Sequence, residues 1–168
     1  MGKYYHYFVE GQDEEKLINV LKTDMQYIVP GKVQKFNVVQ EKLTSLRLMQ
    51  LKKGTIVVLV FDTDSGNIQI LQENIELLKK SGIVKTVLCV TQVKNLEDEL
   101  VRSCNIRQIK ELTGSKSNKD FKHDLIKDSH FCKKLEIYKF DLKKFWNMTD
   151  KGTYSKIKND ADKIKLKQ

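Results

Sequence analysis

Long apolar runs separate amphipathic stretches along the first hundred residues of the chain. The most continuous run, residues 56–61, holds apolar residues only. A run of this kind is typical of a strand buried on both faces inside a parallel sheet. Other apolar or partly alternating runs predict three more strands, the second of them near a sheet edge. The predicted strands span residues 4–9, 33–39, 56–61 and 84–90.

Between the strands, apolar residues recur at intervals of three and four, which is the spacing of an amphipathic helix. The clearest series consists of Ile68, Leu71, Ile75 and Leu78. A regular alternation of strands and helices predicts parallel strands joined by right-handed crossovers. The sequence therefore predicts an α/β fold: a Rossmann-like sheet of about four parallel strands with helices on both faces.

Capping residues set the predicted helix boundaries. Asp13 is a candidate N-cap for a helix after the first strand, and Asn95 is a candidate N-cap after the fourth. A further helix is predicted over residues 41–53, where Gly54 supplies a stop. The expected inward face of that helix consists of Leu43, Leu46 and Met49.

The pattern changes beyond Cys104, where short apolar stretches flank a polar, basic loop. We expect a single domain over residues 1–168, with a core at 1–103 and a basic, mainly helical C-terminal extension at 104–168. The elements expected in the extension are helices at 106–112 and 121–126, a strand at 135–140 and a frayed tail from Thr149.

Charge is distributed unevenly along the chain, whose formal net charge is +9. Residues 1–103 contain 14 Lys and Arg against 13 Asp and Glu, whereas residues 104–168 contain 17 against 9. A basic excess confined to one part of a chain favours a polyanionic partner, so we expect nucleic acid to bind there. A lysine-rich solvated surface is the alternative.

Membrane and disulfide classes are disfavoured by the sequence. No apolar run has the length of a membrane span and no signal-peptide core is present, so we expect a cytoplasmic protein without a membrane partner. The cysteines, Cys89, Cys104 and Cys132, have neither CxxC spacing nor histidines at ligand spacing. Zinc binding and a disulfide framework are therefore not expected.

Two aspartates follow the central strand. Asp62 and Asp64 are two residues apart, so an extended backbone would point both carboxylates the same way. Glu10 follows the first strand, and the carboxyl ends of parallel strands meet at one sheet edge, where α/β proteins bind ligands. Carboxylates held this close repel one another unless a cation neutralises them. The pattern predicts a Mg²⁺ or Mn²⁺ site, with a solvated Asp-rich turn as the alternative.

These motifs resemble the Toprim domain of topoisomerases, primases, OLD-family nucleases and small ribosomal-RNA maturases. Two segments carry the resemblance. Residues 8–14 read Phe-Val-Glu-Gly-Gln-Asp-Glu, and residues 60–66 read Val-Phe-Asp-Thr-Asp-Ser-Gly. The likeness covers residues 4–103 and implies a Toprim-like version of the predicted sheet.

The resemblance also implies roles for individual residues. Glu10, Asp62 and Asp64 would bind Mg²⁺, and Glu10 would serve as an acid or base as well. Glu97 is similar to a further acidic residue of OLD-family nucleases, which helps to hold a second metal. The basic stretch 116–122 is similar to the region where those nucleases place a lysine near the scissile phosphate.

Contacts to the substrate are expected from the basic loop and from one glycine. Lys116, Lys119 and Lys122 lie in or beside the loop, where flexible lysines and backbone N–H groups can follow a phosphate backbone. Gly11 lacks a side chain and leaves room beside Glu10 for a phosphate or a metal-bound water.

Departures from the family narrow the expected function. The sequence has no P-loop ATPase and no second large domain of the kind that topoisomerases and primases need. We expect a stand-alone, metal-dependent nuclease acting on DNA or RNA, in antiphage defence or RNA processing, with room for a partner protein that supplies other activities. Two alternatives stay open. One is a non-catalytic Toprim-like module that binds nucleic acid or protein, and the other is a receiver- or phosphatase-like domain with Asp62 as phosphoacceptor.

Overall fold

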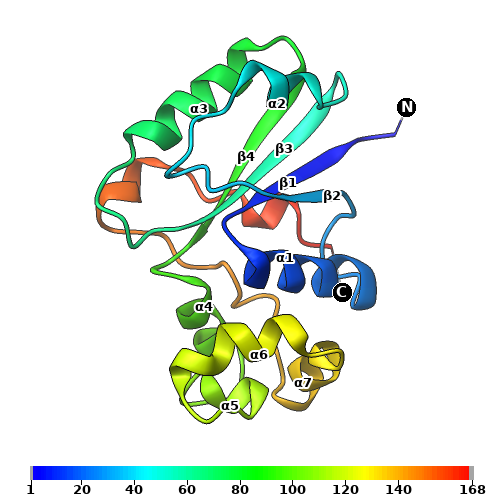
Figure 1. The fold of residues 1–168 in the computed structure, drawn as a ribbon, viewed down its shortest axis with the longest axis vertical. Coiled ribbons are helices and arrows are strands. Elements are labelled where there is room, and N and C mark those ends of the chain that lie inside the picture. The colour runs from blue at the N-terminus through cyan, green and yellow to red at the C-terminus, as the bar shows by residue number, and fades with distance from the viewer. Residues whose placement is uncertain (1, 167–168) are drawn as a thin grey trace.

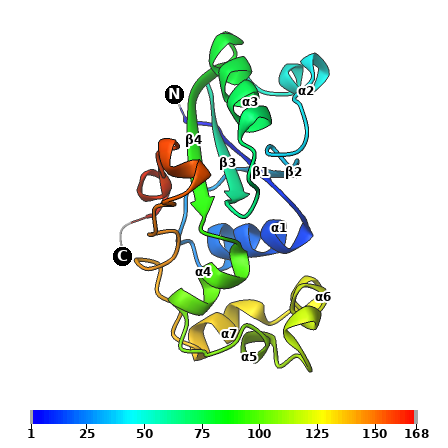
Figure 2. The same cartoon turned by 90° about the vertical axis from the view of Figure 1, so that its left-hand side faces the viewer.

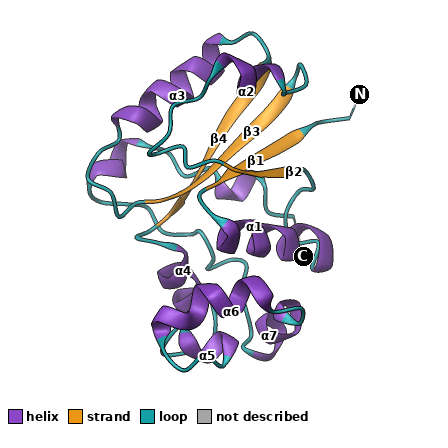
Figure 3. Ribbon diagram, viewed as in Figure 1, coloured by secondary structure: helices purple, strands orange, loops and turns teal. Residues whose placement is uncertain are grey.

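The structure of the chain is a computed structural model that describes residues 2–166. Four parallel strands form one sheet in the order β2-β1-β3-β4, and helices lie on both of its faces (Figures 1 and 3). The predicted α/β fold class and the edge position of the second strand are confirmed. The strands are β1 (Tyr5–Val9), β2 (Lys32–Lys35), β3 (Thr55–Asp62) and β4 (Val84–Gln92).

Helices connect the strands and form most of the C-terminal extension. Within residues 2–166, none of them has the length and apolar character needed to cross a membrane. The α-helices are α1 (Gln12–Asn19), α2 (Ser45–Met49), α3 (Gln69–Lys80), α4 (Leu96–Ser103), α5 (Lys110–Thr113), α6 (Phe121–Lys127) and α7 (Phe131–Ile137). A π-helical turn at Val20–Asp24 extends α1, and 3₁₀ turns lie at Asn118–Asp120, Thr153–Lys156 and Ala161–Lys163.

The central strand β3 is buried along its whole length, as its apolar run predicts. Its side chains alternate between two hydrophobic cores, one on each face of the sheet. Val58 and Val60 face the core that α1 and α4 cover. Val57 and Leu59 face the core that α2 and α3 cover. The helices on both faces therefore pack against β3, which presents apolar side chains to each face.

The chain reverses direction across the sheet between β1 and β3. These two strands are neighbours, but the chain leaves β1 toward β2 on one side and leaves β3 toward β4 on the other. The connecting helices α1 and α3 lie on opposite faces (Figure 2). Such a topological switch point opens a crevice at the carboxyl ends of the strands, which is where open α/β sheets bind ligands.

The helices α5, α6 and α7 of the C-terminal extension lie beyond the carboxyl ends of β3 and β4 (Figures 1 and 2). Phe121 and Leu125 of α6 are buried in the same core as Leu17 of α1. The mainly helical character of the extension is confirmed. Its position brings residues of α6 to the end of the sheet that holds the switch point.

The strand and the frayed tail predicted for the extension are both wrong. The strand predicted at residues 135–140 is replaced by α7, in which Phe131 and Leu135, four residues apart, form the buried face. The tail predicted to fray from Thr149 is ordered up to residue 166, because its apolar side chains enter the cores. These side chains are Tyr154, Ala161 and Ile164. Residues 167 and 168 lie outside the described part of the chain.

The helix predicted at residues 41–53 is wrong in extent, since α2 covers only Ser45–Met49. The Asn74 amide of α3 donates to the carbonyls of Val38 and Glu41 and accepts from the Leu43 N–H, which holds the preceding segment as a loop. Leu43 is buried, but the other two residues of the predicted inward face, Leu46 and Met49, are each 74% exposed. The helix predicted at 106–112 likewise forms only over Lys110–Thr113, as α5.

Candidate metal centre

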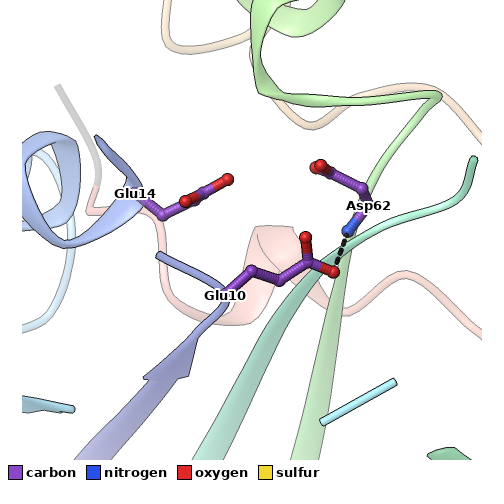
Figure 4. Close-up of side chains that lie close together, drawn as sticks. All are labelled: Glu10, Glu14 and Asp62. Carbon is purple, nitrogen blue, oxygen red and sulfur yellow. Dashed lines mark hydrogen bonds between the residues drawn. The ribbon is translucent and has the colours of Figure 1, made fainter. Parts of the chain in front are cut away.

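Two predicted site residues lie side by side at the switch point. Glu10 follows β1 directly, and Asp62 is the last residue of β3. The backbone N–H of Asp62 donates a hydrogen bond of 3.1 Å to Glu10 Oε1 (Figure 4). The buried strand β3 fixes the Asp62 backbone, so this bond also fixes one oxygen of Glu10 at the sheet edge.

A third carboxylate comes from α1. One oxygen each from Glu10, Glu14 and Asp62 lies within 4.8 Å of the other two, and the three side chains point into a common space (Figure 4). Glu14 Oε2 accepts the Gly11 N–H over 3.1 Å, which makes Gly11 the N-cap of α1. The prediction of Asp13 as N-cap is therefore wrong, because Asp13 lies inside the first turn.

Gly11 is tightly surrounded by the acidic side chains of α1. A Cβ atom at this position would lie 3.1 Å from Asp13 Oδ1 and 3.4 Å from Glu14 Oε2. The room that a glycine leaves beside Glu10 is thus occupied, in part, by two further carboxylates. A larger residue at position 11 would press first on the Asp13 carboxylate.

The three carboxylates are held at an electrostatic cost. Burial is the main cause that raises the pKa of Asp62, to about 8, and the charges of Glu10, Asp64 and Glu97 raise it further. Burial also raises the pKa of Glu14, to about 9, with Asp13 and Asp62 adding to the effect. The pKa of Glu10 is raised by burial too, although the Asp62 N–H offsets part of the shift. Each shift disfavours the ionised form, so a cation placed among these oxygens would relieve the repulsion.

Asp64 does not belong to the closest set of oxygens. The strand β3 ends at Asp62, so the alternation that would align the two aspartates does not continue to Asp64, which is exposed. Its charge still raises the pKa of both Glu10 and Asp62. Asp64 therefore lies at the rim of the site, on the side of the loop that follows β3.

Lys122 of α6 reaches the acidic side of the site. Its Nζ lies 3.6 Å from Asp13 Oδ2 and 3.5 Å from Glu97 Oε1, although these residues come from α1 and α4. Burial lowers the pKa of Lys122, but the charges of Asp13, Glu97, Glu14 and Asp62 outweigh it, and the net pKa is raised. The structure thus places Lys122 and Glu97, two predicted site residues, next to the carboxylate cluster.

The other two predicted lysines lie elsewhere on the surface. Lys116 and Lys119 are exposed, and neither forms an ion pair with another residue in the described range 2–166. Lys119 lines a shallow surface pocket together with Glu97 and Arg107. Of the three lysines, the fold brings one to the cluster.

Sequence reasoning missed three residues of the site: Glu14, Gln92 and Trp146. Gln92 Nε2 donates to Asp62 Oδ1 over 2.7 Å, and Trp146 Nε1 donates to Gln92 Oε1 over 3.2 Å. Gln92 ends β4 opposite Asp62, so the rule that places ligands at strand ends would have found it had the strand been extended by two residues. No local signal in the sequence points to Trp146.

The donor set fits a hard divalent cation. Carboxylate oxygens are the ligands that Mg²⁺ and Mn²⁺ prefer, and Mg²⁺ commonly binds a few carboxylates while it keeps several waters. Asp13 Oδ2, which is buried and has no hydrogen-bond partner among the described residues, adds a further carboxylate next to the cluster, 3.6 Å from Lys122 Nζ. Comparison of the chain with protein-family models, with curated proteins and with solved structures finds no match in any of the three.

Proposed function

We propose that this chain is a divalent-metal-dependent phosphodiesterase that hydrolyses nucleic acid, with a Toprim-like carboxylate centre. The observation that supports it best is the meeting of Glu10, Glu14 and Asp62, whose oxygens lie within 4.8 Å of one another at the switch point. Buried carboxylates in this number and at this distance are costly without a counter-cation. A bound divalent cation would offset this free-energy cost, which is why the cluster supports a metal centre.

The residues fit the chemistry of Mg²⁺ or Mn²⁺ at this place. Such an ion would supply an activated water and stabilise the charge that develops on a phosphodiester. Glu10, Glu14 and Asp62 would hold the ion, and Asp64 at the rim would add negative charge on the loop side. Glu10, with one oxygen engaged by a backbone N–H, keeps its second oxygen for a proton transfer.

Lys122 and the basic extension support a phosphate-bearing substrate. Lys122 keeps its positive charge beside the carboxylates, and its side chain is 54% exposed, so it can turn toward a phosphate at the mouth of the site. The excess of basic residues in 104–168 is a charge balance that favours a phosphate-bearing partner.

The test is an assay of the purified chain on plasmid DNA, tRNA and ribosomal RNA, with Mg²⁺, with Mn²⁺ and with a chelator. We expect cleavage that requires the divalent ion and that Asp62→Asn abolishes. Asp24→Asn, the same change at an exposed residue of the extended α1, is the matched control and should keep full activity. Full activity of Asp62→Asn, or cleavage in the presence of chelator, would contradict the proposal. The preferred substrate separates RNA processing from antiphage cleavage of DNA.

A second candidate is phosphoryl transfer to Asp62. Acidic neighbours beside a strand-end aspartate and a lysine close by are the set that a phosphoacceptor site needs, and Glu14 with Lys122 provides it. Asp62 is only 8% exposed and one of its oxygens is engaged by Gln92, which disfavours attack by this carboxylate. Incubation with a small phosphodonor and Mg²⁺, followed by intact-mass analysis, decides between the two, since a stable phosphate on Asp62 favours the second candidate.

A further inference from the structure

We infer that Gln92 and Trp146 are positioning residues for Asp62, and that the C-terminal extension thereby sets the metal affinity of the site. This inference rests on the proposed function. The carrying observation is a chain of hydrogen bonds from Trp146 Nε1 to Gln92 Oε1, 3.2 Å, and from Gln92 Nε2 to Asp62 Oδ1, 2.7 Å. Both bonds are buried, and they join residues 54 and 30 positions apart in the sequence.

The indole of Trp146 decides which way the Gln92 amide faces. An indole N–H can only donate, so the Gln92 group that meets it must be the carbonyl oxygen. The amide NH₂ of Gln92 is then directed at Asp62, where it engages Oδ1 and leaves Oδ2 for a ligand. Without the indole, the Gln92 carbonyl would lose its donor, and the amide would be held by Asp62 alone.

The backbone of Trp146 has an unusual conformation that is held by hydrogen bonds from neighbouring segments. Trp146 has a φ of +56°, a left-handed conformation that is unusual for a bulky side chain. Its N–H donates to Glu99 Oε1 over 3.2 Å, and its carbonyl accepts from Asn159 Nδ2 over 2.8 Å. Strained backbone held by surrounding bonds is a recurrent feature of functional sites.

Glu99 anchors this arrangement from the opposite side. Its carboxylate is fully buried and accepts from the backbone N–H groups of Val93 and Trp146, and the Arg102 guanidinium lies 3.1 Å away. Its bonds tie the end of β4 and the start of α4 to the segment that carries Trp146. The tie explains how a residue of the extension is held rigidly against a residue of the sheet.

Outer hydrogen-bond partners of metal ligands typically change metal affinity by about 10–100-fold when they are removed. Gln92→Met keeps the length of the side chain but removes both bonds. Trp146→Phe keeps an aromatic ring against Phe145 and removes the N–H together with part of the buried ring volume. We expect Mg²⁺ and Mn²⁺ affinity, measured by calorimetry, to fall about tenfold or more in Gln92→Met and by a smaller factor in Trp146→Phe. Gln72→Met, the same change at an exposed residue of α3, should bind as the wild type does.

A spectroscopic readout separates positioning from a loss of stability. Trp146 is the only tryptophan of the chain, so tryptophan emission reports on its surroundings, which include the Gln92 contact. In the wild type we expect the emission to change with Mg²⁺ and to saturate at the concentrations that calorimetry gives. In Gln92→Met, Trp146 is still present but the response should shrink or vanish at saturating Mg²⁺, while far-UV circular dichroism stays that of the folded chain.

The outcomes distinguish this inference from the proposed function. If the wild type binds Mg²⁺ and both folded variants bind it with wild-type affinity, the inference is overturned and the metal centre stands. If the wild type binds neither Mg²⁺ nor Mn²⁺, the proposed function fails and the inference falls with it. Should Gln92→Met not fold, the affinity of Trp146→Phe decides, and an unchanged affinity counts against the inference.

Discussion

The backbone N–H of Asp62 donates to the side chain of Glu10 across 52 residues of sequence, at a distance of 3.1 Å. The bond joins the ends of two neighbouring parallel strands through one peptide group and one carboxylate. It supplies Glu10 with a donor that no mutation of a side chain can remove. A charged residue at the end of a buried strand is thereby stabilised without a neighbouring basic residue.

Removal of one negative charge should stabilise the metal-free protein. In Asp62→Asn the amide oxygen can still accept from Gln92, whereas the repulsion from Glu10 disappears. We expect the free energy of unfolding, measured in urea above the pKa of Asp62, to rise by roughly 2 kcal/mol. Mg²⁺ should no longer stabilise this variant. A metal-free variant less stable than the wild type would show that the carboxylate is not under repulsion.

The stability of the metal-free protein should fall as pH rises. Burial raises the pKa of Asp62 from 3.8 to about 8 and that of Glu14 from 4.5 to about 9. Between the ordinary and the raised values the folded state holds more protons than the unfolded state, so the free energy of unfolding decreases from about pH 4 to about pH 9. Thermal unfolding across this range measures the slope. Saturating Mg²⁺ should remove most of the decrease, since the ion takes the place of the protons.

Lys122 should contribute more to nucleic-acid binding than other lysines of the same helix. Lys122→Met removes the positive charge beside Asp13 and Glu97 and leaves these carboxylates facing the substrate uncompensated. We expect weaker binding and a log–log salt slope smaller by about 0.7–0.9, the contribution of one phosphate contact. Lys127→Met in α6 is the matched control. Equal salt slopes for both variants would show that Lys122 forms ion pairs within the protein and does not contact the nucleic acid.

Tyr154 tests whether the C-terminal extension is part of the folded core. Its ring is fully buried against Phe61, with centroids 5.8 Å apart, and its hydroxyl has no hydrogen-bond partner among the described residues. Tyr154→Ala should cost about 3–5 kcal/mol of unfolding free energy. Tyr154→Phe removes a buried hydroxyl without a partner and should leave stability unchanged or raise it by about 1 kcal/mol. A loss of stability in Tyr154→Phe would reveal a bond to the hydroxyl, for example through water.

The strands β1, β3 and β4 were predictable because each is largely an apolar run. The strand predicted at residues 33–39 is wrong in extent, since β2 covers only Lys32–Lys35 and has a single apolar residue. Residues 56–61 are all apolar and lack the spacing of an amphipathic helix, and the observed strand β3 covers Thr55–Asp62. The tail was not predictable from local pattern, since its few apolar residues are widely spaced and its burial depends on contacts with β3 and β4. Residues 135–140 show the opposite problem, because a short apolar stretch suits a strand and a helix alike.

The candidate site was predictable where topology alone positions the residue. Glu10 and Asp62 follow from the rule that parallel strand ends meet, which needs no side-chain detail. Glu14 was not predicted as a site residue, because acidic residues are common in the first turn of a helix, where the helix dipole favours them. Asp64 was predicted to point the same way as Asp62 because side chains alternate along an extended strand. The strand ends at Asp62, so this alternation does not reach Asp64. Trp146 depends on a left-handed backbone, which sequence patterns do not reveal.

Asp160 determines what can happen at the outer edge of β4. Its backbone N–H donates to the Cys89 carbonyl, and its carboxylate accepts the Cys89 N–H, so Asp160 occupies both backbone groups that Cys89 would offer to an adjoining strand. Open edges of sheets recruit strands from other molecules. The opposite edge strand, β2, is only four residues long and has a lysine at each end. If the segment around Asp160 were lost, β4 would become a template for strand addition, and the failure would take the form of aggregation between molecules.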